Sequence, residues 1–184
     1  EVGPPVSTEN NRTEIHWNEV YDPDKTTRTE LRDEHGRTVE NTEINDLING
    51  TEIVHYPVDP TTGLCDETQY ERTVQNADGE VVSKQMIADI GDVHTELTIN
   101  PETGNIVDGV MKDKDGNNTE LKADIKTLEN GQTEVKWQDP NTQDTIRYDR
   151  LDTDNRLIEV GTPVSRGNDR TEIEWHAPGS TDIT

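Results

Sequence analysis

Segment 113–120 carries the side chains whose spacing best suits a metal ion. In its sequence DKDGNNTE, Asp113, Asp115 and Asn117 occupy alternate positions around a glycine, and their side-chain oxygens are ligands that Ca²⁺ prefers. An EF-hand loop also needs a glycine at its sixth position and a glutamate at its twelfth, and this segment has neither. We therefore interpret it as a hairpin turn, with a calcium site as the alternative, and we expect no other cofactor.

The residues that could carry acid–base or nucleophilic catalysis follow no common spacing. The 5 histidines stand in unrelated sequence contexts, and Cys65 is the single cysteine and has no partner motif. Asp and Glu together number 40 and are dispersed along the chain, so the proximity of two carboxylates would not by itself indicate catalysis. We therefore expect no enzyme activity, and the sequence allows no intramolecular disulfide.

Aromatic residues recur just after one short motif, Thr-Glu-apolar. They are Trp17, Tyr56, Trp137 and Trp175, and Ile99 takes the corresponding place in a fifth copy. A row of such rings could stack against sugars, which makes these four residues candidates for a binding platform. The alternative is the apolar stripe of a core, which we prefer because the sequence has few other large residues to fill one.

The same motif defines an internal period. Its copies begin at Thr13, Thr51, Thr95, Thr133 and Thr171, so the steps are 38, 44, 38 and 38 residues. The longer step indicates a 38-residue unit with an insertion, which we place around residues 61–71. The predicted organisation is a linker or the end of a preceding repeat over 1–12, repeats over 13–50, 51–94, 95–132 and 133–170, and the start of a fifth repeat over 171–184.

Turn signals divide each unit into short segments. One set contains proline, which presets the backbone for a turn, at 22–26, 59–63, 100–104 and 139–143. A second set ends in glycine or asparagine, which accept a positive φ, at 33–36, 76–79, 113–116 and 152–155. Apolar and polar residues alternate between the turns, as in strands. Segment 119–131 also fits a short helix, but we prefer a strand there, so each unit is predicted to be a β-meander of three or four strands.

The two ends of the chain repeat each other at a larger spacing. Residues 1–17 align without a gap on residues 159–175, an offset of 158 that equals the four steps taken together. Either the chain is part of a tandem array with a superrepeat of four units, or the two segments are equivalent parts of a head-to-tail assembly. In both cases units with one apolar face must cover each other. The expected partners are therefore adjacent repeats or further copies of the chain.

Composition limits the remaining functions. Only 27% of the residues are hydrophobic and 4% are aromatic, and the formal net charge is −23. Such a chain is repelled by nucleic acid and by anionic membranes, so neither is an expected partner. A dispersed acidic surface also suits a salt-rich, halophilic environment, with an ordinary acidic secreted protein as the other interpretation. We expect neither a membrane-spanning segment nor a signal peptide in these residues.

Three segments, 28–40, 70–82 and 147–160, resemble the Tyr-Asp repeats of RHS-type shells. The matching residues are Tyr148-Asp149 and Asn155-Arg156-Leu157 in one unit and Gly36-Arg37 in another. No unit carries the complete pattern, and the period is longer than the usual one of that family. The resemblance implies a spiral or shell of β-hairpins and brings no catalytic residues with it.

Together these patterns predict an all-β chain in which tandem repeats of 38 residues form an extended array. The expected function is structural and non-enzymatic, as a stalk, fibre or filament segment on the surface of a cell or virion. One alternative is an adhesin or carbohydrate-binding repeat, whose partner would be a surface glycan or a protein receptor. A second alternative is part of an RHS-type encapsulating shell.

Overall fold

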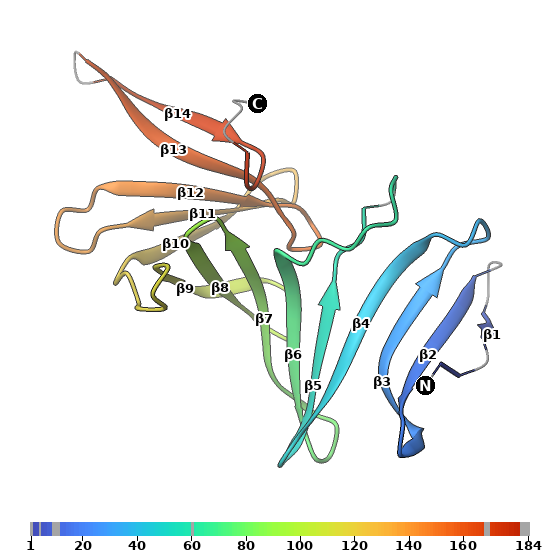
Figure 1. Ribbon diagram of the computed structural model, residues 1–184. Coiled ribbons are helices and arrows are strands. Elements are labelled where there is room, and N and C mark those ends of the chain that lie inside the picture. Colours follow the sequence, from blue (N-terminus) through green and yellow to red (C-terminus); the bar gives the residue numbers. More distant parts are fainter. Residues whose placement is uncertain (1, 4, 9–11, 60, 168–169, 181–184) are drawn as a thin grey trace. The chain divides into compact units, whose positions relative to one another are not determined.

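The computed structural model describes residues 2–3, 5–8, 12–59, 61–167 and 170–180. Of the described residues 64% are in strands, which confirms the all-β prediction (Figure 1). The described residues include no helix, and so no helical segment able to cross a membrane. The strands are β1 (Val6–Ser7), β2 (Thr13–Glu19), β3 (Asp22–Arg32), β4 (Thr38–Leu47), β5 (Gly50–Tyr56), β6 (Gln69–Asn76), β7 (Val81–Ile90), β8 (Val93–Ile99), β9 (Ile106–Lys112), β10 (Lys122–Thr127), β11 (Thr133–Gln138), β12 (Thr145–Leu151), β13 (Leu157–Gly167) and β14 (Arg170–His176).

The strands form two antiparallel sheets in which neighbours in sequence are neighbours in space. One sheet has the order β1 to β9 and the other the order β10 to β14. Short connections explain this order, because each hairpin returns the chain alongside the strand it has just left. By compactness the chain divides into unit 1, Glu1–Lys84, and unit 2, Gln85–Thr184, with β7 running from one into the other.

The segment for which a helix was the alternative is a strand, as preferred. Strand β10 pairs with β11 so that Ala123 lies opposite Trp137 and Ile125 opposite Val135. Both β10 residues pack against the core of unit 2, together with Leu121. These three residues alternate in sequence, so the two-residue period of a strand, not helical spacing, places them on one side.

The four predicted turns that end in glycine or asparagine share one set of hydrogen bonds. In the first, the amide of Gly36 donates to the carbonyl oxygen of Asp33 at 3.0 Å. The carboxylate Oδ1 of Asp33 also accepts from the amides of His35 and Arg37, each at 2.9 Å. The side-chain oxygens that accept the corresponding bonds in the other turns belong to Asn76, Asp113 and Asp152. The fourth residue always has a positive φ, including 60° at Asn155, so a side-chain acceptor and a permissive residue three positions on specify these hairpins.

Three of the four predicted proline turns share a second pattern. In segment 59–63 the carboxylate Oδ1 of Asp59 accepts from the amides of Thr61 at 2.7 Å and Thr62 at 3.2 Å. The first residues of the other two turns, Asn100 and Asp139, accept the same bonds. The side chain that precedes the proline therefore holds the loop closed in each case.

The predicted proline turn at 22–26 is wrong. These residues belong to β3, and the chain reverses earlier, through Val20 and Tyr21. Glu19 already lies opposite Asp22 in the β2–β3 pair. The reversal uses Val20 and Tyr21, which carry no turn signal, so it is complete before the chain reaches the proline of segment 22–26.

The connection between β5 and β6 is longer than those between β8 and β9 and between β11 and β12. Twelve residues separate Tyr56 from Gln69, whereas six separate β8 from β9 and six separate β11 from β12. Within this connection Val58 and Cys65 form an isolated antiparallel bridge. This longer connection overlaps segment 61–71, where the insertion was predicted. The division into repeats stays a prediction.

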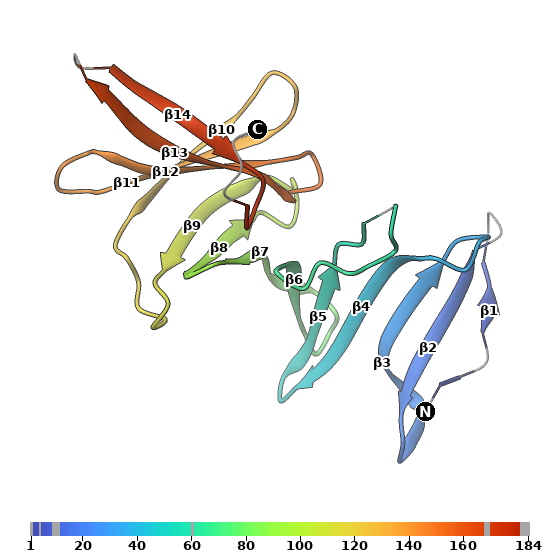
Figure 2. The same cartoon turned by 45° about the horizontal axis from the view of Figure 1, so that its top comes forward.

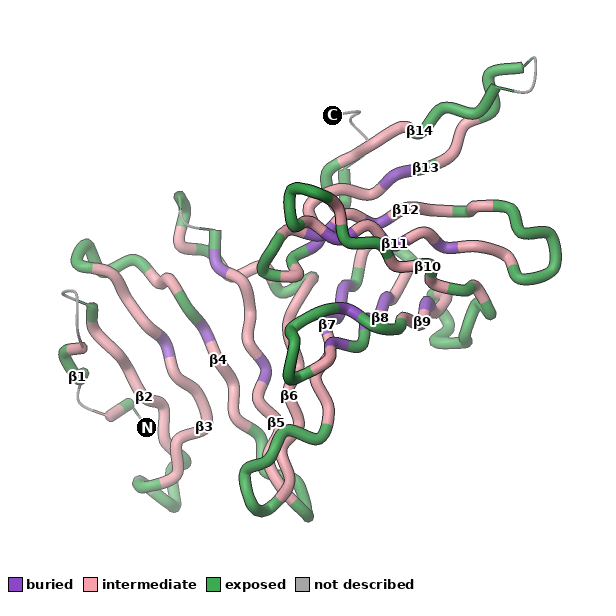
Figure 3. The backbone as a smooth tube through the Cα atoms, turned by 180° about the vertical axis from the view of Figure 1, so that it is seen from behind, coloured by how far each residue is buried: buried purple, intermediate pink, exposed green. Residues whose placement is uncertain are grey.

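Unit 2 contains a hydrophobic core. Its buried members are Met86, Ala88, Leu97, Ile99, Ile106, Met111, Val135, Trp137, Leu151 and Leu157. They come from strands β7 to β9 and from β11 to β13, so strands of both sheets face each other within this unit (Figures 2 and 3). Trp137 is 0% exposed, and a side chain at Gly109 would meet its ring at 2.9 Å. The glycine therefore makes room for the largest side chain of the core.

Unit 1 is a single layer in which strands β1 to β6 lie side by side (Figure 1). Only Glu30, Asn41, Val54 and Val58 are buried among its described residues. A sheet of this kind gains little from apolar burial, so backbone hydrogen bonds and cross-strand side-chain pairs must stabilise it. Within the ranges that the structure describes, the hydrophobic core therefore lies in unit 2.

Candidate interaction surface

One face of the unit 1 sheet gathers long side chains from neighbouring strands. Residues directly opposite each other on paired strands point to the same face. The register places Arg28 opposite Trp17, and Glu43 opposite Arg28. It also places Val54 opposite Glu43 and Arg72 opposite Val54. Five adjacent strands, β2 to β6, thus contribute to this face.

Two tyrosines extend the same face. Tyr56 follows Val54 by two residues and Tyr70 precedes Arg72 by two, so both share its direction. Their ring centroids are 5.6 Å apart with the planes tilted by 47°. We call this surface the aromatic face and define it by Trp17, Arg28, Glu43, Tyr56, Tyr70 and Arg72. All six residues are partly exposed.

Charged groups position the aromatic rings of this face. The guanidinium carbon of Arg28 lies 4.9 Å from the ring centroid of Trp17, within the range of a cation–π contact. Arg28 Nε donates to Asn41 Oδ1 at 2.8 Å, which fixes the guanidinium beside the ring. The hydroxyl of Tyr56 donates to Glu43 Oε2 at 3.4 Å. Burial, with the nearby charge of Glu43, raises the pKa of Tyr56, so its hydroxyl stays a donor.

The remaining charges on this face are paired. Arg72 Nε donates to Glu52 Oε1 at 2.5 Å, and Arg32 Nε to Glu30 Oε1 at 2.8 Å. Burial raises the pKa of Glu30, but hydrogen bonds from Arg32 and Thr38 outweigh it and hold the pKa below its ordinary value. The face thus offers half-exposed rings between fixed ion pairs, an arrangement that can stack on and hydrogen-bond a polar ligand but contains no activated nucleophile.

The structure separates the four predicted platform residues. Trp17 and Tyr56 lie on the aromatic face of unit 1, as described above. Trp137 is buried in the core of unit 2, where its indole N–H donates to Asp149 Oδ2 at 2.7 Å. It offers no ring face to a ligand, in keeping with the core interpretation that we preferred. Burial raises the pKa of Asp149, and Arg147 Nε at 2.6 Å opposes that shift.

Trp175 has a third environment, on the last strand of unit 2. The guanidinium carbon of Arg150 lies 3.9 Å from its ring centroid, and the ring of Tyr148 is 6.1 Å away. Between them stands Gly161, where an added Cβ would meet the Trp175 ring at 3.0 Å. Trp175 remains partly exposed, so among the four residues Trp17, Tyr56 and Trp175 can reach a ligand.

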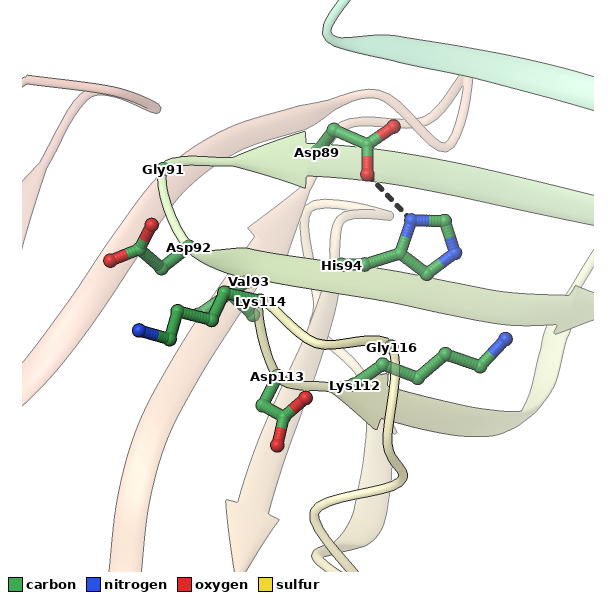
Figure 4. A pocket seen from close by; sticks show the side chains of 9 residues that line it. All are labelled: Asp89, Gly91, Asp92, Val93, His94, Lys112, Asp113, Lys114 and Gly116. Carbon is green, nitrogen blue, oxygen red and sulfur yellow. Dashed lines mark hydrogen bonds and ion pairs between the residues drawn. The ribbon is translucent and has the colours of Figure 1, made fainter.

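A hollow of 510 Å³ in unit 2 brings together the side chains that come nearest to an acid–base site (Figure 4). His94 Nδ1 lies 2.5 Å from Asp89 Oδ1, and His94 Nε2 lies 2.9 Å from Glu96 Oε1. Lys112 Nζ also bonds to Glu96. Burial lowers the pKa of His94, but the two carboxylates outweigh it and raise the pKa above its ordinary value. An imidazolium held at both nitrogens cannot accept a proton, so this cluster is an ion-pair network.

The candidate calcium ligands form a hairpin turn beside the same hollow. The carboxylate Oδ1 of Asp113 accepts from the amides of Asp115 at 2.9 Å and Asn117 at 3.0 Å. These and further hydrogen bonds, with that from the Asn117 amide the strongest, hold the pKa of Asp113 below its ordinary value. Across the described ranges, no group of three or more His, Cys, Asp or Glu residues is arranged to hold a metal ion. The calcium site stays a prediction, and the oxygen best placed for it is already engaged in closing the turn.

The two terminal hairpins have the same strand register. Ser7 lies opposite Thr13 in β1–β2, and Ser165 lies opposite Thr171 in β13–β14. The adjacent pairs agree as well: Val6 with Glu14, and Val164 with Glu172. These two pairs of the second hairpin are the two pairs of β1–β2 advanced by 158 residues, the offset of the sequence repeat.

The likeness of the two hairpins stops before their open ends. Val2 lies opposite Trp17 in the first, whereas Gly161 lies opposite Trp175 in the second, a difference of one residue in register. The shared register therefore covers the part of each hairpin nearer its turn.

Sequence reasoning missed Tyr70, Arg28 and Arg72 as members of the aromatic face. A signal existed in segment 28–32, where Arg, Glu and Arg alternate with the period of a strand. Placing them beside Trp17 requires the register of the β2–β3 pair, which one strand alone does not determine.

Comparison with known protein families, with curated proteins and with solved structures finds no match for this chain. The resemblance to Tyr-Asp repeats stays a prediction.

Proposed function

We propose that this chain is a non-enzymatic structural segment, built from tandem three-strand repeats and serving as a stalk, fibre or filament at the surface of a cell or virion. The observation that carries the proposal is the equivalence of the two terminal hairpins. Segments with nearly the same sequence, 1–17 and 159–175, pair in the same register around their turns. Equal hairpins at a fixed spacing are what an array of stacked units requires.

The recurring turns support the same proposal. The Thr-Glu motif recurs in every third strand, since it begins or lies within β2, β5, β8, β11 and β14. The same hydrogen bonds close the turns that begin at Asp33, Asn76, Asp113 and Asp152. A local module that is closed in the same way each time can be added in series without a new core.

The charge of the chain suits a surface location. The net charge of −23 comes from carboxylates dispersed along the chain, which keeps a long array soluble and resists lateral clumping. Salt screens such a charge over distances of about 10 Å at 0.1 M, so the array fits a saline medium outside the cell.

A joined chain tests the proposal. In it, residues 1–175 are followed directly by residues 18–184, so that Trp175 takes the place of Trp17 and β14 leads into a second β3. Small-angle scattering should give a longer maximum dimension with an unchanged cross-sectional radius, and circular dichroism should give the same strand content per residue. A cross-section that grows with length, or an added segment that stays unfolded, would rule the array out.

A second candidate function is binding of a carbohydrate at the aromatic face, as in an adhesin. The observation that favours it is the set of half-exposed rings, Trp17, Tyr56 and Tyr70, beside fixed guanidinium groups. If glycan-array screening identifies a ligand, Trp17→Ala should lower its affinity by about tenfold, because a stacking ring is lost. His55→Ala, on the opposite face of β5, is the matched control and should leave the affinity unchanged. Equal effects of the two substitutions would exclude the aromatic face as the site.

A further inference from the structure

We propose that hairpin β13–β14 of one copy of this chain can replace β1–β2 on strand β3 of a second copy, so that separate chains join through one continuous sheet. The inference rests on the proposed function, because it assigns the contact that holds successive copies of the array together.

Strand β14 presents the edge that this exchange needs. It is the last strand of its sheet in the described part of the chain, with β13 on its inner side (Figure 2). Residues 170–173 of β14 are exposed. The outer backbone groups of such a strand are a template for pairing with another chain.

The sequence of β14 matches the strand that β3 already accepts. Up to the register irregularity after Trp17, the direct pairs of β2 with β3 are Thr13–Arg32, Glu14–Leu31, Ile15–Glu30, His16–Thr29 and Trp17–Arg28. Advanced by 158 residues, β14 offers Thr171, Glu172, Ile173, Glu174 and Trp175 in the same order. Four of these five pairs would therefore be reproduced, and the exception places Glu174 where His16 stands. Beyond the irregularity after Trp17, His176 and Ala177 would take the places of Asn18 and Glu19.

The change from His16 to Glu174 is compatible with β3. Glu174 would lie opposite Thr29, next to Leu31 and to Thr26, whose Oγ1 now lies 3.5 Å from Nδ1 of His16. None of these carries a negative charge, so the added carboxylate meets no like charge on β3. The hydroxyl of Thr27 now donates to the carbonyl oxygen of Trp17 at 3.1 Å, a backbone acceptor that any residue at this position supplies.

Pairing of β14 with β1 of a second copy is the less favourable contact. Strand β1 has 2 residues, whereas β3 spans 11 and already aligns with a strand of the β14 sequence. A one-residue slip on β3 would turn the shared Trp and Ile positions to the other face. The number of pairs and the fixed register therefore select β3 of a second copy as the partner.

Cysteine pairing tests the contact in the full chain. With Cys65→Ser in every variant, a chain with Thr171→Cys is mixed with one carrying Arg32→Cys and oxidised. We expect an intermolecular disulfide between positions 171 and 32, identified by peptide mass, whose yield rises with concentration. The matched control replaces Arg32→Cys by Leu31→Cys, which lies one residue out of register and should give about tenfold less disulfide. Equal yields from the two mixtures, or no disulfide from either, would overturn the exchange.

A locked chain keeps the proposal testable if the mixed variants fold poorly. Thr13→Cys with Arg32→Cys in one chain should join β2 to β3, because these residues are direct partners. Sedimentation velocity should then show loss of association, restored by a reductant; association that persists in the locked chain contradicts the exchange. If the joined chain elongates but no 171–32 disulfide forms, the array stands and the exchange falls. If the 171–32 disulfide forms but the joined chain does not elongate, the exchange is retained and the array is refuted.

Discussion

Replacing Trp137 and Trp17 in turn should show how differently the two units are stabilised. Both residues end a copy of the same sequence motif, yet Trp137 is 0% exposed and Trp17 is half-buried on a single-layer sheet. Trp→Ala in a packed core costs about 3–5 kcal/mol. Loss of the indole N–H also removes a bond to Asp149, which is buried. We therefore expect Trp137→Ala to lower the free energy of unfolding of unit 2 by about 4 kcal/mol or more.

Trp17→Ala should cost much less. Trp17 is only partly buried, so its truncation removes less buried surface than that of Trp137. The cation–π contact with Arg28 is worth about 0.5–1 kcal/mol at a partly exposed site. We expect a total loss of about 1–2 kcal/mol in unit 1, since large losses require a cavity, and a half-exposed residue leaves none.

Urea unfolding followed by circular dichroism and tryptophan fluorescence separates these outcomes. With a slope of about 2 kcal/mol per molar urea, Trp137→Ala should lower the midpoint of its unit by about 2 M and Trp17→Ala by less than about 1 M. Trp137→Phe, which keeps a ring but not the N–H donor, is the control and should fall between them. If Trp17→Ala were as costly as Trp137→Ala, the distinction between a cored unit and a single-layer unit would be refuted.

Three further results are expected. Gly50→Ala should strongly destabilise unit 1, because the added Cβ would lie 1.9 Å from the carbonyl oxygen of Gln75; a melting temperature within about 1 °C of the parent would contradict that geometry. The pKa of His94 is raised above 6.5, so the stability that its ion pairs contribute is fully present below pH 6.5 and is lost as the pH rises through the folded-state pKa of His94. The pKa of Glu96 is lowered below 4.5, so the stability that its ion pairs contribute is lost as the pH falls below 4.5. Melting temperatures across this range should therefore decline on both sides, and His94→Gln should remove the decline on the alkaline side, a change of about 1 kcal/mol or less. A calcium site at 113–117 would make the melting temperature higher with Ca²⁺ than with a chelator. Equal melting temperatures would exclude the site.

The local parts of this fold were predictable because they depend on few neighbouring residues. Hairpins that begin at Asp33, Asp113 or Asp152 need a side-chain acceptor and a residue that tolerates a positive φ, and both stand in the sequence. The β10 strand followed from alternation. The turn predicted at 22–26 failed because the actual reversal uses Val20 and Tyr21, whose residue types carry no turn preference.

The candidate site was less predictable because it depends on register and on layering. Trp17 and Trp137 have the same sequence context, and only the second layer of unit 2 buries one of them. Tyr70 reaches Tyr56 across a connection of twelve residues, whose path no local pattern specifies. The alternation of apolar and polar residues predicts which segments are strands, but the residues that meet across two strands depend on the pairing register, which one segment alone does not determine.

Hydrogen exchange of the β14 amides tests the central claim that the two terminal hairpins are equivalent modules. It would be measured in the 184-residue chain and in the joined chain of residues 1–175 followed by 18–184. If β14 is a second β2, the amides of residues 171–175 that point outward should become as protected in the joined chain as those of residues 13–17, because a second β3 then pairs with them. Unchanged exchange at residues 171–175, with the added strands folded elsewhere, would contradict the account.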